Sequence, residues 1–598
     1  MVDPRIYRGF LVLVAFAVIV FGFSLQNQPG SLGASVAPGQ FFSGAYGTMT
    51  TLAKHYPRRA PGSPGDQRLA NYVQRQLSGR PGSQIHGFSV QTEDSTASTA
   101  AGDRTLETVT ATRPGVGSGT VVVVSHRDAT QPHAVADMSG TAVMLDLARA
   151  LSGETLNRSV TLVSTSGQIG AAGATQLAQS LAGQQVDAVI VLGNLAGSRV
   201  RNPIVVPWSN TDSLAPPLLG NTLAKFVSAQ AGLKNQGNGI AGQFVRLAFP
   251  FALTEQAPFD ARGIPAVLLS LSGDRPATGS LALGSAGRLA GLGNAVLGTV
   301  NALDNGAAVA APSSYLLLSG KVVPLWAVRL LVLALLLPVV ATTVDAAARA
   351  HRRGHTLVRW LGWVLSGAVP FVVGLVALLI ARVSGLLSAT PPGAVGIGVK
   401  LTGGDVAVLL VVLALVVVSF VFLRPVCLRA LTRLPEFGRR PVSPAADAAA
   451  VALSVVMCVL TLVIWVRDPF AALLLVPALH LWLWLAQPGA RSRRWLAALL
   501  VLLAAVPAVL VLVYYANSYG LSPVGLAWSL ALMTGRALPV VTALCWSIAL
   551  GCLASAVVIA ARAMQATTAA PEPTVTVRGP AGYAGPGSLG GTESALRR

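Results

Sequence analysis

Eight apolar runs constrain this chain more than any other feature, because each is close to the length of a membrane-spanning helix. Such a helix needs about 20 apolar residues to cross the hydrocarbon core. The runs cover residues 9–23, 322–342, 360–381, 404–423, 446–466, 469–487, 495–515 and 538–561. With 53% hydrophobic and only 11% charged residues, a chain of 598 residues is too apolar to be entirely water-soluble. The short, glycine-interrupted stretch 520–535 is predicted to lie at the membrane interface.

The first apolar run is predicted to remain in the protein as an anchor. It follows Arg5 and Arg8, a pattern that a cleaved signal peptide shares. The small residues at 34–37 are the candidate cleavage site, and Pro38 directly after them disfavours cutting. An uncleaved N-terminal span is therefore preferred over a signal peptide.

Arginines gather in alternate loops between the apolar runs, and this predicts the orientation of the chain. Positively charged loops stay on the cytoplasmic side of a membrane. The arginine-rich loops hold Arg349, Arg352, Arg353 and Arg359; Arg424, Arg429, Arg433, Arg439 and Arg440; and Arg491, Arg493 and Arg494. Eight spans starting from a cytoplasmic N-terminus place all three loops and the C-terminus inside, and residues 26–319 outside. These loops explain the net charge of +20, so we expect a multi-pass cell (plasma) membrane protein with no nucleic-acid partner.

All four cysteines lie in the membrane part or its cytoplasmic loops: Cys427, Cys458, Cys545 and Cys552. The outer domain therefore has neither a disulfide nor a thiol nucleophile. An extracytoplasmic domain without disulfides suits a bacterial cell membrane.

These features divide the chain into six segments. We expect an N-terminal transmembrane anchor (1–25), a linker (26–42), an extracytoplasmic α/β domain (43–303), a second linker (304–319), a membrane domain of about seven spans (320–563) and a disordered cytoplasmic tail (564–598).

The outer domain alternates short apolar runs with helical patterns. The runs at 120–125, 160–164, 188–192 and 266–271 have the character of strands covered on both faces. Helical patterns cover 66–77, 141–151, 172–181, 217–231 and 282–303. The alternation predicts an α/β domain with a mixed, largely parallel sheet sandwiched by helices, attached to an all-α, multi-span membrane domain.

His126 and Asp137 are the first candidates for chemistry in this domain. His126 ends the run "TVVVVS", and Asp128 follows two residues later, where its carboxylate can hold one ring nitrogen of a metal-binding histidine. Asp137 stands just before a predicted helix. The competing interpretation, favoured on these residues alone, makes Asp137 a helix cap and His126 a polar residue at the rim of the sheet.

The order of seven segments adds a resemblance to a known family. They are "RRAPGSPGDQRLANYVQRQL", "TVTATRPG", "SHRD", "ADMSGTAVMLDLARAL", "STSGQIGAAGA", "VLGNLAG" and "TEQAPFDARGIPAVLL". In this order, over about residues 45–300, they resemble the motifs of the two-zinc exopeptidase family, which includes secreted aminopeptidases, glutaminyl cyclases and the transferrin-receptor ectodomain. The combination with several spans also resembles the attachment subunit of the GPI transamidase and the membrane-bound metallopeptidases of the endoplasmic reticulum.

The resemblance implies a metal site that has lost most of its ligands. His126 matches a zinc-ligating histidine, Asp128 its second-shell partner and Asp137 the bridging aspartate. The replaced positions are Gly167 for the general-base glutamate, Gln168 for a ligating glutamate, Asn194 for a ligating aspartate and Gln256 for the last ligating histidine. Neutral amides are poor zinc ligands, and glycine has no side chain to act as a base.

The resemblance therefore implies a membrane protein with a catalytically inactive peptidase-fold domain that acts in binding, assembly or regulation. We expect no cofactor, and the lipid bilayer and a peptide or protein ligand as partners. The alternatives are an active zinc aminopeptidase, which would bind zinc and use Glu255 or Asp260 in a shifted register, and a transporter with an outer sensor domain. The transporter is disfavoured because only Arg329 and His480 are ionisable well within the apolar runs.

Overall fold

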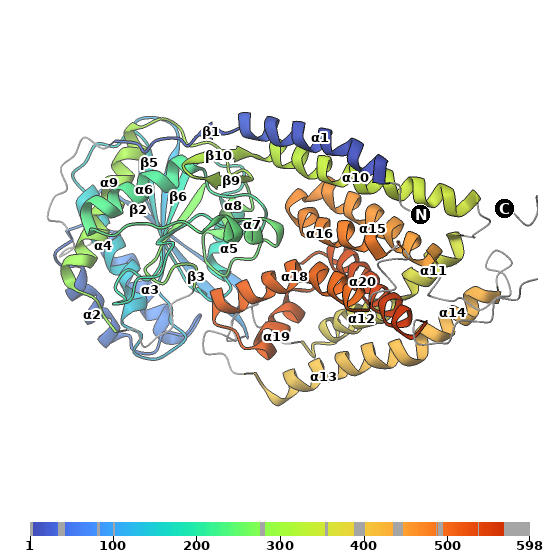
Figure 1. Ribbon diagram of the computed structural model, residues 1–598. Helices are drawn as coiled ribbons and strands as arrows, with labels where there is room; N and C mark the ends of the chain where they lie inside the picture. Colours follow the sequence, from blue (N-terminus) through green and yellow to red (C-terminus); the bar gives the residue numbers. More distant parts are fainter. Residues whose placement is uncertain are drawn as a thin grey trace, which may run out of the picture.

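The computed structural model describes residues 4–33, 42–79, 84–99, 102–275, 282–352, 357–387, 401–433, 447–485, 487, 494–535 and 538–566. Figure 1 shows two parts side by side, an α/β part and a bundle of helices, with α1 and α10 running along one edge of the bundle. Part of each arginine-rich loop, and the tail from residue 567 onward, lie outside the described residues.

A seven-stranded mixed sheet forms the centre of the α/β part, with strand order β2-β3-β5-β4-β6-β8-β7. The strands are β2 (Ser89–Thr99), β3 (Gly102–Arg113), β4 (Thr120–His126), β5 (Ser159–Thr165), β6 (Val186–Leu192), β7 (Val205–Val206) and β8 (Ala266–Leu269). The four middle strands, β5, β4, β6 and β8, are parallel, and the outer strands are antiparallel. The predicted fold class is confirmed, and the antiparallel pair β2–β3 adds an edge that the apolar runs did not indicate.

Helices cover both faces of this sheet. They are α2 (Ala45–His55), α3 (Pro64–Leu77), α4 (Ser139–Leu151), α5 (Ala172–Ser180), α6 (Pro217–Ala231), α7 (Ile240–Ala248), α8 (Ala257–Asp260) and α9 (Ala286–Asn305), with a 3-10 turn η1 (Ala136–Met138) before α4. Successive side chains of a strand point to opposite faces. Accordingly, Val121 and Val123 belong to the apolar core that contains α4 and α9, whereas Val122 and Val124 belong to a core that continues into the helical bundle.

A small antiparallel sheet joins the two parts. Its strands are β1 (Gln26–Asn27), β9 (Tyr315–Leu318) and β10 (Lys321–Pro324), in the order β1-β10-β9. The segments predicted to be linkers thus carry β1 and β9, and β10 leads directly into α10.

The bundle contains α1 (Pro4–Phe23), α10 (Leu325–Arg352), α11 (Leu357–Ser366), α12 (Val369–Val383), α13 (Gly403–Val418), the π-turn η3 (Ser419–Leu423), α14 (Arg424–Arg433), α15 (Asp447–Arg467), α16 (Pro469–Leu485), α18 (Arg494–Tyr519), α19 (Pro523–Met533) and α20 (Val540–Ala566). Among the described residues, six helices are long and apolar enough to cross a membrane, or seven if the bent pair α11–α12 counts as one span. The eighth predicted span corresponds to α16, which has 17 residues and falls just short.

His480 packs between helices, as one would expect of a histidine without a transport role. Its Nδ1 lies 2.7 Å from the hydroxyl of Tyr7 in α1, and its Nε2 lies 3.1 Å from the carbonyl oxygen of Leu335 in α10. These contacts tie α16 to its two neighbours.

Candidate functional site

The candidate site lies where the parallel strands end. His126 is the last residue of β4 and pairs with Thr165, the last residue of β5. Leu192 and Leu269 end β6 and β8 at the same edge. Loops that follow parallel strands converge at this edge, which is the usual position of binding sites in α/β folds.

The turn after β5 leaves no room for a side chain at residue 167. Gly167 has a φ of +86°, and a Cβ built on it would lie 2.9 Å from the Cβ of Ala172 and 3.1 Å from a methyl group of Leu106. The turn closes through hydrogen bonds from the amides of Ala172 and Gly173 to the carbonyl oxygens of Gly167 and Ser166. The position matched to the general base is therefore shaped for glycine.

Glu255 holds the histidine of the site. The Nδ1 of His126 lies 2.9 Å from Oε2 of Glu255, and both side chains are at most 4% exposed. The other carboxylate oxygen of Glu255 accepts a hydrogen bond from the Thr165 hydroxyl at 3.3 Å. Burial lowers the pKa of His126, but the charge and hydrogen bond of Glu255 outweigh it and raise that pKa to about 9. His126 is thus an imidazolium, paired with a carboxylate, at neutral pH.

Asp128 supports the turn. Its carboxylate accepts hydrogen bonds from the backbone amides of Gly167 at 3.0 Å and Gln168 at 3.2 Å. Burial, partly offset by the charge of His126, raises the pKa of Asp128 to about 7. The bond predicted between Asp128 and a His126 ring nitrogen is not the one formed, because Glu255 takes Nδ1.

Asp137 lies in η1, buried at 2% exposure, and does not cap the helix that follows. Among the described residues, its Oδ1 has no hydrogen-bond partner. Burial raises the pKa of Asp137 to about 6, and the charges of His126 and Arg59 lower it. Arg59 is itself 1% exposed, and its guanidinium donates to the carbonyl oxygens of Arg127, at 3.0 Å, and Ala134.

Two of the amide side chains at the replaced ligand positions, Asn194 and Gln256, make hydrogen bonds within the protein. Asn194 Oδ1 accepts hydrogen bonds from the amides of Ala196 and Gly197, and its Nδ2 donates to Ser272. Gln256 donates to the carbonyl oxygen of Trp208 at 2.8 Å. These residues therefore stabilise loops at the edge of the sheet.

A cavity of about 10 Å³ remains at the site, lined by His126, Gln168, Gly193, Asn194, Leu253, Thr254, Glu255, Leu268, Ser270 and Arg275. This is space for about one water molecule. Zinc hydrolases use three protein ligands of the His, Cys, Asp or Glu types. In the described part of the chain, no three such side chains are grouped to hold a metal ion, and Nε2 of His126 and Oδ1 of Asp137 are buried without a hydrogen-bond partner there.

Three residues of the site are not predicted from the sequence in the positions that the structure gives them: Glu255, Arg59 and Arg275. The sequence offers Glu255 only in a shifted register, although it directly precedes Gln256 and lies beside His126. Arginine is nearly always exposed unless paired, so no pattern in the sequence marks an arginine that becomes buried in a site.

Comparisons with known proteins agree with the resemblance. The family model described as Peptidase family M28 matches residues 108–282. No curated protein matches. Similar solved structures include a glutaminyl cyclase from an Acidobacteriales bacterium, with 18% identity over 47% of this chain and 99% of that chain (TM-score 0.36). A leucine aminopeptidase precursor from Bacteroides thetaiotaomicron has 12% identity over 44% and 99% (TM-score 0.34). A zinc aminopeptidase from Bacillus subtilis has 11% identity over 44% and 95% (TM-score 0.35). The family match confirms that the chain carries an M28 peptidase-like domain.

Gly167→Ala is expected to destabilise the outer domain by about 1–3 kcal/mol, because alanine is strained at this φ and its methyl group meets Leu106 and Ala172. Ala171→Gly is the matched control, since Ala171 already has a φ of +53° that glycine adopts freely. Thermal unfolding of the full chain in detergent measures both. Equal stability of Gly167→Ala and the wild type would contradict this account of the turn.

The pairing of His126 with Glu255 predicts a pH dependence. Because folding raises the pKa of His126 from about 6.5 to about 9, its stabilisation is complete below pH 6.5 and is lost as the pH rises through 9. The thermal unfolding midpoint of the wild type should therefore decrease as the pH is raised from 7.5 to 9.5. Glu255→Gln should lower this midpoint at pH 7.5. It should also make the decrease with rising pH smaller, because without the carboxylate His126 is already neutral at pH 7.5. A decrease of the same size in both proteins would refute the ion pair.

Proposed function

We propose that this chain is a membrane protein whose outer peptidase-like domain acts in binding, assembly or regulation and does not hydrolyse peptides. One observation carries the proposal: the turn at the position matched to the general base has no room for a side chain, and Glu255, Asn194 and Gln256 each make a hydrogen bond within the protein. Glu255 neutralises His126, and Asn194 and Gln256 hold loops. A hydrolase needs a base and an activated water at this edge, and Gly167 supplies no side chain for the purpose.

The competing function is that of a zinc aminopeptidase. It is favoured by the unexpected presence of Glu255, which brings a third carboxylate near His126 together with Asp128 and Asp137. Against it, Glu255 is committed to Nδ1 of His126 and to Thr165, and Asp128 to two backbone amides. Both carboxylates are thus engaged in hydrogen bonds within the protein.

Metal content separates the two functions. The full chain, purified in detergent, is equilibrated with zinc and dialysed, and zinc per chain is counted by mass spectrometry beside an aminopeptidase substrate screen. We expect far less than one zinc per chain and no hydrolysis above the His126→Ala variant. One or two zinc ions per chain, lost in His126→Ala, or hydrolysis that this variant abolishes, would overturn the proposal.

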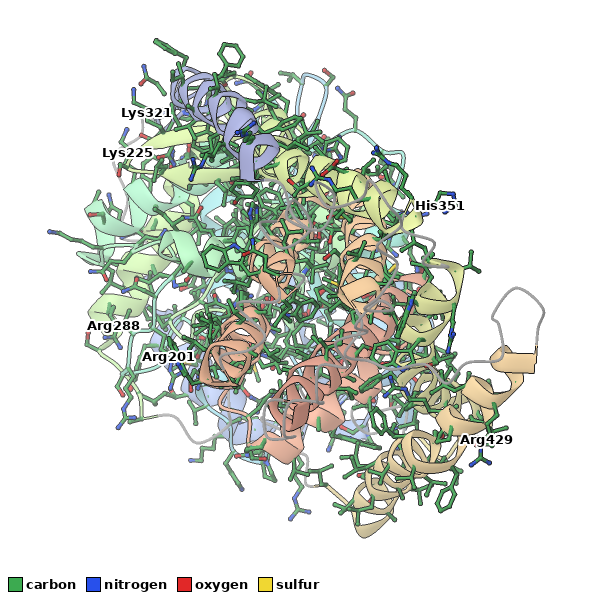
Figure 2. The ribbon with its side chains drawn as sticks, turned by 45° about the vertical axis from the view of Figure 1, so that its right-hand side comes forward. Arg201, Lys225, Arg288, Lys321, His351 and Arg429 are labelled. Atoms are coloured by element: carbon green, nitrogen blue, oxygen red, sulfur yellow. The ribbon has the colours of Figure 1, made fainter. Side chains whose placement is uncertain are left out.

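We also propose that the N- and C-termini are cytoplasmic and that residues 26–319 face the outside of the plasma membrane. The start of α1, the end of α10 and helix α14 lie at the end of the bundle away from the α/β part (Figure 1). His351 and Arg429 lie on the opposite side of the molecule from Lys225, Arg288 and Arg201 (Figure 2). The cationic ends of α10 and α14 thus share one side, which the positive-inside rule assigns to the cytoplasm.

Labelling with a membrane-impermeant maleimide tests this orientation. In a full-length variant whose four cysteines are replaced by alanine, Val116→Cys, at a position 88% exposed in the outer domain, should react in intact cells. His351→Cys, at the exposed end of α10, should react only after the cells are permeabilised. The reverse pattern would invert the topology.

A further inference from the structure

We propose that the end of α18 and the turn after it, residues 511–521, form a lid that closes the candidate site, so that the membrane helices control ligand access. We call this segment the α18 lid. The inference concerns regulation of the site and rests on the proposed function, in which this site binds a ligand. Figure 1 shows the end of α18 reaching from the bundle to the α/β part.

The α18 lid makes hydrogen bonds to the segment just before Glu255. The Tyr519 hydroxyl donates to the carbonyl oxygen of Phe251 at 2.9 Å, and the Tyr515 hydroxyl donates to that of Phe249. The ring of Phe251 packs edge-on against both tyrosines. Its centroid lies 5.9 Å from that of Tyr515 and 5.4 Å from that of Tyr519. Glu255 follows four residues after Phe251. The lid therefore contacts the loop that carries Glu255, the partner of His126.

The lid also covers the turn on the other side of the cavity. Ile169, next to Gln168, is 4% exposed and lies in one apolar cluster with Leu253 and with lid residues Val511, Tyr515, Tyr519 and Leu521. Both walls of the cavity, the β5–α5 turn and the loop before α8, therefore contact the same membrane helix.

Arg275 ties the cavity wall to the lid backbone. It lines the cavity, and its guanidinium donates to the carbonyl oxygens of Asn517 and Ser518. These carbonyls belong to the last turn of α18, where helical partners run out and a cation is favourable.

A buried arginine completes the set of contacts between α18 and the α/β part, which we call the seam. Arg246 of α7 is 3% exposed, and its guanidinium donates to the hydroxyls of Tyr514 at 3.0 Å and Tyr519 at 3.2 Å and pairs with Asp274. It also lies 5.3 Å from the ring centre of Trp208, whose carbonyl oxygen accepts the bond from Gln256. The seam thus reaches from the lid to a residue at a replaced ligand position.

The α18 lid acts on the cavity through its walls, because Leu253 and Arg275 line the cavity and contact lid residues. The cavity of about 10 Å³ holds about one water molecule, so in our proposal a peptide enters the site only after the lid has moved. By thermodynamic linkage, a ligand that favours the open state then shifts α18, and a change in the membrane part that moves α18 alters ligand affinity. The protein would therefore couple events on its outer side to its membrane helices.

The test measures access without requiring a ligand, zinc or activity. The full chain, with its four cysteines replaced by alanine, carries Gln168→Cys, which lines the cavity and is 7% exposed. Its rate of reaction with N-ethylmaleimide is measured in detergent, first alone and then with Tyr515→Phe and Tyr519→Phe together. The two changes keep the rings and remove three hydrogen bonds, to Phe249, Phe251 and Arg246, so we expect the rate to rise about tenfold or more.

Two controls separate lid opening from unfolding. Ala148→Cys, a fully buried position in α4, reports on the domain core and should stay unreactive in every variant. Tyr72→Phe alters a tyrosine of α3 that is outside the lid and should leave the Gln168→Cys rate unchanged. If the double variant makes Ala148→Cys reactive, Tyr519→Phe alone, which still leaves the seam largely intact, replaces it.

The lid is refuted if Gln168→Cys reacts fast in the parent protein, or if the tyrosine variants leave its rate unchanged while Ala148→Cys stays silent. Failure of the proposed function is separate, since zinc binding or hydrolysis would contradict the non-catalytic role and leave the labelling result standing. An unchanged rate in a protein that binds no zinc would reject the lid alone.

Discussion

A buried guanidinium needs an opposite charge and hydrogen-bond acceptors beside it, and Arg246 has such partners in both parts of the chain. Asp274 and Trp208 come from the α/β part, and Tyr514 and Tyr519 come from α18. Removing one partner of a buried charge is costly because the other charge remains without water. Arg246 therefore joins the two parts next to the candidate site.

The same rule governs the interior of the site. Arg127 and Asp66 form an ion pair at 2.8 Å with both side chains fully buried, and the Ser166 hydroxyl donates to Asp66. Through Ser166, this pair contacts the turn that carries Gly167. His126 and Glu255 form a second buried pair at the end of β4. The buried polar groups at this edge are thus stabilised by pairing of opposite charges.

Prediction from the sequence succeeded where a pattern is local. The apolar runs at 120–125 and 160–164 became β4 and β5, and the position of His126 at the end of a strand followed from them. It failed where pairing depends on register and distance along the chain. Glu255 meets His126 across 129 residues, and Tyr519 meets Arg246 across 273. The family motif aligns Gln256 with a histidine ligand. The side chain that reaches His126 is instead that of Glu255, one residue earlier.

The sequence by itself determined the kinds of element, because hydrophobic periodicity and run length depend on neighbouring residues alone. It also determined the resemblance to the M28 peptidases and the absence of a side chain at Gly167. Tertiary structure alone decided which charges neutralise each other, that Asn194 and Gln256 bond to loops, and that α18 packs against the loops beside the site. These outcomes require the final packing, since a buried polar group is stabilised only by the partners that the fold brings within hydrogen-bond distance.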